Sequence, residues 1–140
     1  MGTIHKQTGQ NGNFLWDGVD VEPYRGGGAT EGGCRAVIVG PNEGAPHFAI
    51  RYFEIPPNGQ SSLEQHAHDH GIVVLRGRAQ AQLGRDVQEV RPGDAIYVPP
   101  NEQHQFKTIG EEPFGFLCVI PSKDLLQKLH RLEEDELARR

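Results

Sequence analysis

Short apolar runs divided by glycine and proline turns constrain the fold of this chain more than any other feature of its sequence. The run 34–39 is rich in β-branched residues, and the run 47–55 alternates its apolar side chains between two faces. Similar runs follow at 71–77, 78–84, 86–90, 95–100, 103–110 and 114–121. Short strands at such regular spacing predict an all-β sandwich or closed barrel rather than alternating strands and helices. The length of 140 residues is that of one domain.

The two ends of the chain differ from this central pattern. Residues 1–33 are polar and glycine-rich, so we expect an N-terminal arm with weak edge strands before a barrel that spans 34–121. In residues 122–140 the apolar period becomes helical, because leucines recur at intervals of three and four residues after Ser122, a suitable N-cap. We therefore predict a C-terminal amphipathic helix that packs on the barrel or on a neighbouring subunit.

Composition and charge argue against several classes of function. The net charge of −5, with no basic stripe, disfavours nucleic acid, whose phosphates need a basic footprint. No apolar run approaches the roughly 20 residues of a membrane span, and the first residues lack the apolar segment of a secretory signal. We expect a cytoplasmic protein in which Cys34 and Cys118 stay reduced. The glycine-rich segment 25–33 lacks the lysine and the serine or threonine of a phosphate-binding P-loop.

A cluster of histidines carries the chemistry of this sequence. Three of the seven histidines, His66, His68 and His70, fall within five residues, and Glu64 lies just ahead of them. Imidazole nitrogens and carboxylate oxygens bind Zn, Mn, Fe, Ni and Cu. A straight strand from Glu64 to His70 would extend about 20 Å, too far for ligands of one ion, so we expect the chain to bend near Asp69. The spacing allows two ligand pairs, Glu64 with His66 or His66 with His68, and does not choose between them.

Two spaced motifs make the chain resemble the cupins, a superfamily of small jelly-roll β-barrels. The first family motif runs from a glycine through His-x-His and a further Glu or His to a second glycine, and it is matched by Gly59, Glu64, His66, His70 and Gly77. The second motif is matched, at the family's intervals, by Gly93, Pro99, Asn101, His104 and Thr108. The resemblance covers roughly residues 45 to 120. It implies a single cupin jelly-roll barrel, followed here by the C-terminal helix.

The resemblance also implies one divalent metal ion per chain, Fe, Mn, Ni, Cu or Zn. The residues at the family's ligand positions are Glu64, His66, His70 and His104. Glu64 stands where the family usually has the first histidine of His-x-His, so a carboxylate replaces an imidazole there. His68 then falls between ligand positions, on a turn or at the rim. Either Glu64 or His68 could act as a catalytic base beside the metal.

Other polar residues have plainer interpretations. We expect His5 in the arm and His130 on the helix to be solvated. Cys118 lies on the last strand, where core packing is the first expectation. Arg51 alternates with apolar neighbours on its strand, and either face of that strand could line the bore.

A metal at the mouth of a barrel, with coordination positions open, can act as a Lewis acid, activate water or, if redox-active, bind dioxygen. The resemblance therefore implies a metal-dependent enzyme with a small-molecule substrate, and we expect an oxidoreductase of the dioxygenase kind. The alternatives are a redox-neutral isomerase, cyclase or lyase on the same site, or a non-catalytic metal- or ligand-binding module. An open metal position beside a polar cavity would favour an enzyme, and a filled bore would favour the module. We also expect a homodimer.

Overall fold

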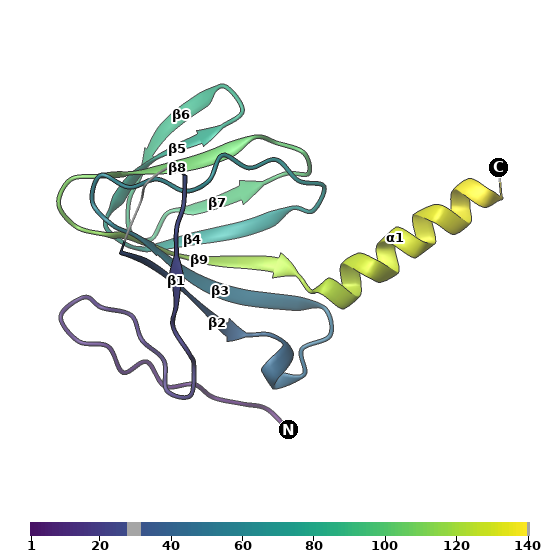
Figure 1. The fold of residues 1–140 in the computed structure, drawn as a ribbon, viewed down its shortest axis with the longest axis horizontal. Helices are drawn as coiled ribbons and strands as arrows, with labels where there is room; N and C mark the ends of the chain where they lie inside the picture. The colour runs from purple at the N-terminus through teal and green to yellow at the C-terminus, as the bar shows by residue number, and fades with distance from the viewer. Residues whose placement is uncertain (28–31, 140) are drawn as a thin grey trace.

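In the computed structural model, which describes residues 1–27 and 32–139, nine strands form two antiparallel sheets and one α-helix follows them (Figure 1). The larger sheet has the strand order β1-β2-β3-β9-β4-β7, and the smaller one has the order β6-β5-β8. The elements are β1 (Glu22–Tyr24), β2 (Gly33–Val39), a 3-10 turn (Pro41–Glu43), β3 (Phe48–Ile55), β4 (His70–Arg76), β5 (Arg78–Leu83), β6 (Asp86–Val90), β7 (Ala95–Val98), β8 (His104–Ile109), β9 (Phe114–Pro121) and α1 (Lys123–Ala138). The predicted loop 25–33 includes residues 28–31, which lie outside the described residues.

The core lies between the two sheets, where alternate side chains of each strand point inward. On β3 the outward Tyr52 packs against the N-terminal arm, whereas the inward Phe53 belongs to the core. The core side chains come from strands of both sheets and include Phe53, Ile55, Ile72, Val74, Phe106, Phe114 and Phe116. Burying one such side chain is worth about 1.5–3 kcal/mol. The prediction of an all-β jelly-roll barrel with a C-terminal helix is confirmed.

Three motif positions, at residues 77, 93 and 101, have a positive φ, and two of them show how the turns are made. Gly77, between β4 and β5, has φ +68°, and a Cβ at this position would collide with the carbonyl of Pro113. Asn101 has φ 65° and stands where the second motif usually has glycine. Asparagine tolerates this conformation better than most residues, because its short polar side chain bonds locally. The substitution of asparagine for glycine therefore preserves the turn that leads into β8.

The N-terminal arm covers part of the outer face of the larger sheet. The rings of Phe14 and Trp16 lie 5.7 and 5.3 Å from that of Tyr52, which is 1% exposed. This packing explains how an outward-facing tyrosine comes to be buried.

The arm is also held at His5. Its Nε2 lies 3.0 Å from a carboxylate oxygen of Glu43, and its Nδ1 lies 2.8 Å from the Asp17 carbonyl oxygen. The hydrogen bond to Glu43 raises the pKa of His5. Only 13% of the His5 side chain is exposed, so the expectation that this histidine is solvated is wrong.

The C-terminal helix begins where the sequence predicts. Ser122 is its N-cap, and the Ser122 Oγ accepts a hydrogen bond of 3.0 Å from the backbone N–H of Leu125. Figure 1 shows α1 pointing away from the barrel, and none of its residues is buried. Leu129 and Leu132 are 46% and 63% exposed, so the helix does not pack on its own barrel. No helix among the described residues is long and apolar enough to cross a membrane.

Candidate metal centre

The segment before β4 is laid along β8, and this pairing brings the two histidine motifs together. The backbone N–H of Glu64 donates to the His104 carbonyl at 3.0 Å, and the N–H of His104 donates back to Glu64 at 2.9 Å. Two residues further on, the N–H of Asn101 donates to the His66 carbonyl at 2.7 Å. Main-chain hydrogen bonds alone therefore place Glu64 and His66 beside the start of β8, where His104 lies.

The chain bends between His66 and His70. Residues 67 and 68 form the bend, and β4 begins at His70, where it pairs with Val98 of β7. An extended segment would place these histidines too far apart for one ion. The bend therefore turns two histidines four positions apart toward a common point.

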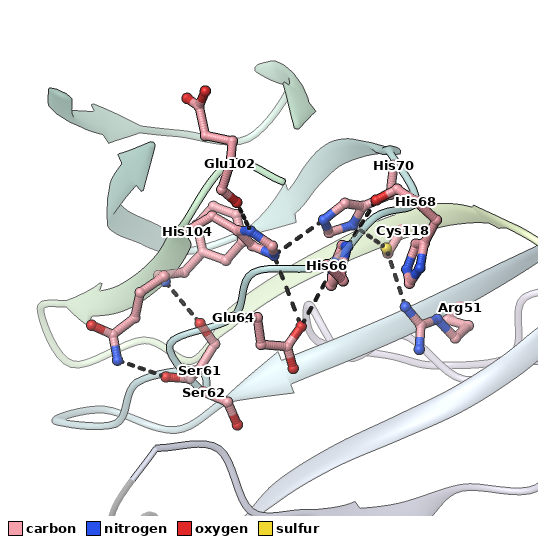
Figure 2. A network of polar contacts seen from close by, with 12 residues as sticks. Arg51, Ser61, Ser62, Glu64, His66, His68, His70, Glu102, His104 and Cys118 are labelled. Atoms are coloured by element: carbon pink, nitrogen blue, oxygen red, sulfur yellow. Dashed lines mark hydrogen bonds and ion pairs between the residues drawn. The ribbon is translucent and has the colours of Figure 1, made fainter. Parts of the chain in front are cut away.

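Three imidazoles converge at the mouth of the barrel, from His66, His70 and His104 (Figure 2). One nitrogen from each ring lies within 4.8 Å of the others, and the Nε2 atoms of His70 and His104 are 3.2 Å apart. Nitrogens that bind one ion at about 2.0–2.1 Å lie at most about 4.2 Å apart. A shift of less than about 1 Å would thus bring all three within coordination distance.

The other nitrogen of each ring has a partner of its own. The Nδ1 of His66 lies 2.7 Å from the His68 carbonyl, and the Nδ1 of His104 lies 2.9 Å from the Glu102 carbonyl. A carbonyl only accepts, so both Nδ1 atoms carry the proton and both Nε2 atoms present a lone pair. The Nδ1 of His70 lies 3.1 Å from the Cys118 Sγ. Such outer partners fix the ring orientations of metal-binding histidines.

The charge state of His70 also suits a ligand. Burial, and then the neighbouring His104 and His66, lower the pKa of His70 to about 3, so this imidazole is neutral at physiological pH. Two ring nitrogens that face each other at 3.2 Å are satisfied by a shared proton or by a cation. The three residues could therefore form a metal site, and a divalent ion fits their donor set.

The structure places Glu64 and His68 differently from these three histidines. A carboxylate oxygen of Glu64 lies 3.7 Å from the His66 Nε2 and 3.8 Å from the His104 Nε2, and the Glu64 side chain is 49% exposed. Glu64 thus lies at the open edge of the cluster. The His68 ring stacks on His66 at 3.8 Å, nearly parallel, and lies outside the converging group. Burial lowers the pKa of His68.

A cavity of about 130 Å³ opens beside the histidines. Its lining combines apolar rings with polar groups from both sheets: Tyr24, Arg35, Arg51, Phe53, Ser61, Ser62, Glu64, His70, His104, Phe106, Phe116 and Cys118. The bore is therefore not filled by side chains near the cluster.

The structure places two residues at this cavity whose position the sequence left open or assigned to the core, Arg51 and Cys118. Cys118 is buried in the core as expected, yet its sulfur contacts His70 and lines the cavity. Arg51 could have been found from its pattern, because it is a charged residue between Ala49 and Phe53 on the inward face of β3. A charge on a buried face is the informative exception in such a strand.

Comparison with known proteins agrees with this architecture. The chain is 38% identical over 109 residues to a 1-methylthio-D-xylulose 5-phosphate methylsulfurylase from Rhodospirillum rubrum, over 76% of this chain and 69% of the relative. A cupin 2 conserved barrel domain protein from Rhodopseudomonas palustris superposes with a TM-score of 0.73 at 33% identity, over 85% of this chain and 80% of that one. A polyketide cyclase from Streptomyces resistomycificus gives a TM-score of 0.64 at 31% identity, over 73% and 74% of the two chains.

A family model for the cupin domain matches residues 51–120. The matched residues make up half of the chain and include both histidine motifs, from Gly59 to Thr108. Since the jelly-roll topology and the solved structures agree with this match, the protein belongs to the cupin domain family.

Proposed function

We propose that this protein is a metal-dependent enzyme that binds one divalent ion through His66, His70 and His104 and acts on a small organic molecule. One observation carries the proposal: three ring nitrogens converge while the opposite nitrogen of each ring is held by a partner. The adjoining cavity gives a small substrate access to that point. A bound metal would supply a Lewis acid that polarises a substrate oxygen.

The side chains around the metal position would bind and orient the substrate and move its protons. The partly exposed carboxylate of Glu64 lies within 4.0 Å of two Nε2 atoms, so it could complete the coordination or accept a proton from the substrate. The rings of Phe53, Phe106 and Phe116 form an apolar wall that limits water in the cavity. His68, stacked on His66, supports that ring and is the second candidate base.

Among reaction types, a redox-neutral rearrangement or group transfer has the stronger support. Two similar proteins with named activities, each more than 30% identical to this chain, are a methylsulfurylase and a polyketide cyclase, and neither name describes an oxygenase. Oxygenase chemistry is the second candidate, because an all-imidazole ligand set with open positions also suits iron or copper.

The metal proposal is tested by elemental mass spectrometry of protein purified without chelators. We expect about one equivalent of a divalent metal in the wild type and almost none in His104→Ala. His130→Ala is the matched control, because His130 lies on α1 with 70% of its side chain exposed and should leave the metal content unchanged. Equal metal content in all three proteins would disprove the assignment.

Oxygen uptake by the iron- or copper-loaded protein separates the two reaction types. Substrate-dependent uptake that disappears in His104→Ala would favour the oxygenase. Turnover under argon at the same rate as in air would favour redox-neutral chemistry. In either case Glu64→Gln distinguishes its two roles, since loss of metal affinity indicates a ligand and retained affinity indicates a base.

We also propose that the chain forms a homodimer through α1. Leu129 and Leu132 are exposed on a helix that has no buried residue, and an isolated helix of this length is marginal in water. Light scattering should give the mass of a dimer for the wild type and of a monomer for Leu129→Glu. The cytoplasmic location and the division into arm, barrel and helix remain predictions.

A further inference from the structure

Arg51 projects into the cavity from the inward face of β3. Its guanidinium carbon lies 4.8 Å from the centre of the Phe53 ring, and its Nη2 donates to the Cys118 Sγ at 3.5 Å. Figure 2 shows the guanidinium directed at Cys118, on the side of the cluster away from Glu64. The stacking on Phe53 and the contact with sulfur hold the planar group in one orientation.

The positive charge of Arg51 has no carboxylate partner among the described residues. Its Nε is buried without a hydrogen bond, and sulfur is a weak acceptor. Two other arginines of the larger sheet are paired: Arg35, on the same cavity, lies 3.1 Å from Glu22, and Arg76 lies 3.3 Å from Glu54. Removing an unpaired cation from water is costly, so the arrangement favours an anion that enters from outside.

We propose that Arg51 is the recognition site for an oxyanion, a carboxylate or a phosphate, on the substrate of this enzyme. The substrate role rests on the proposed function, whereas binding of an anion at Arg51 does not need the metal. A planar guanidinium matches the two oxygens of such a group with parallel hydrogen bonds. A neutral molecule of the same shape would leave the charge uncompensated, so the site selects anionic substrates.

The position of Arg51 also determines where the rest of the substrate lies. The Cys118 sulfur that accepts from Arg51 lies 3.1 Å from the Nδ1 of His70, and the Nε2 of the same ring faces the cluster. The guanidinium is therefore connected to the metal position through one sulfur atom and one imidazole ring. A short substrate anchored at Arg51 presents its next few atoms to the histidines, within a cavity of about 130 Å³.

The test is an NMR titration of the protein with inorganic phosphate, acetate and neutral acetamide, with and without bound metal. The buried Nε–H of Arg51 gives its own signal, which is assigned by its absence from the spectrum of Arg51→Lys. We expect saturable shifts of this signal with one or both anions and none with acetamide. Phosphate and acetate together show which kind of oxyanion the site prefers.

Arg51→Gln should weaken anion binding at least about tenfold in the metal-free protein, and Arg51→Lys should retain part of it because it keeps the charge. The control is Arg78→Gln, which removes an exposed arginine paired with Glu89 and should bind the anions like the wild type. Unchanged affinity in Arg51→Gln, or no saturable binding by the wild type, would overturn the proposal. If Arg51→Gln does not fold, the anion affinities of Arg51→Lys and Arg78→Gln are compared instead. Weaker binding by Arg51→Lys would support the proposal, and equal binding by the two variants would overturn it.

Metal content is measured on the same samples, so the two proposals fail separately. Anion binding that depends on Arg51 in a protein that takes up no metal would support this inference and refute the proposed metal enzyme. Normal metal uptake with an anion affinity that does not depend on Arg51 would support the metal site and refute the anion site.

Discussion

The barrel mouth and the tail helix depart from the usual distribution of side chains in opposite directions. At the mouth, polar groups are buried: His70 and His104 are 8% and 3% exposed. On α1, apolar groups are exposed, with Leu129 and Leu132 among them. Buried polar groups and exposed apolar groups are the observations that point to function, since buried apolar groups and exposed polar groups need no explanation.

The two departures call for different kinds of ligand. The ring nitrogens of the mouth are held by hydrogen bonds at fixed positions, which suits a small ion and a small substrate. Leu129 and Leu132 of α1 are exposed to solvent in their own chain, which suits another protein surface. Substitutions that change one region and leave the other intact therefore test directly whether the barrel mouth and α1 bind their ligands independently.

The largest effect is expected at the mouth, from His66→Ala. A divalent metal that binds only the folded state should stabilise the wild type by about 2.7 kcal/mol at a concentration 100 times its Kd. His66→Ala should lose most of this stabilisation, whereas Leu132→Ala should keep all of it. Urea denaturation with and without metal measures the difference, and equal stabilisation of the two variants would contradict this independence.

A smaller loss of metal affinity is expected from Cys118→Ala, which removes the partner of the His70 Nδ1. Loss of such an outer contact typically weakens metal binding about 10- to 100-fold. Cys118→Ser keeps an acceptor and should lose less, and Cys34→Ala, on β2, should lose nothing. Competition with a chelator measures the affinities. Identical values for Cys118→Ala and Cys34→Ala would show that the sulfur does not orient His70.

At the tail, Ser122→Ala should cost about 1 kcal/mol of local helix stability. The Oγ accepts from the N–H of Leu125 and donates to the Pro46 carbonyl at 2.6 Å, so one hydroxyl caps the helix and joins it to the barrel. Circular dichroism should show fraying of α1 while metal affinity stays unchanged. A loss of metal affinity in this variant would mean that the two regions are coupled.

The smallest effect concerns the N-terminal arm, which belongs to neither region. Because folding raises the pKa of His5 above 6.5, its contact with Glu43 contributes fully below pH 6.5 and is lost as the pH rises through the folded-state value. The stability of the wild type relative to His5→Gln should therefore be greater at about pH 5 than at about pH 9. Denaturation midpoints at the two values measure it, and an equal difference at both would contradict the assignment.

Sequence patterns were sufficient for the strands, and the family motifs contain the three histidines whose ring nitrogens converge in the structure, whereas the metal-binding role of these residues and of Glu64 stays a prediction. The alternation in β3 and the helical spacing after Ser122 are local, and the structure reproduces both. The motif spacings predicted that His66, His70 and His104 lie close together, because the cupin resemblance carries information about which segments far apart in the sequence pair in the fold. Residue periodicity alone left the ligand pair open, since the bend at residues 67 and 68 depends on pairing with β8.

The environment of Arg51 and of the arm could not be read from the sequence. Whether Arg51 meets a carboxylate depends on which side chains five other strands bring to the cavity. The burial of His5 depends on Glu43, which lies 38 residues away and is brought near by the fold. Both are contacts between segments with no shared pattern, so no local rule predicts them.

The packing of the arm has a consequence for optical spectroscopy. Trp16 is the single tryptophan of the protein, and it is partly buried against Phe14 and Tyr52 on the outer face of the barrel. Its fluorescence therefore reports on one event, the attachment of the arm. Release of the arm into water should shift the emission to longer wavelength, whereas fraying of the distant tail should leave it unchanged. The chain thus contains an intrinsic, label-free probe for the packing of its first residues on the barrel wall.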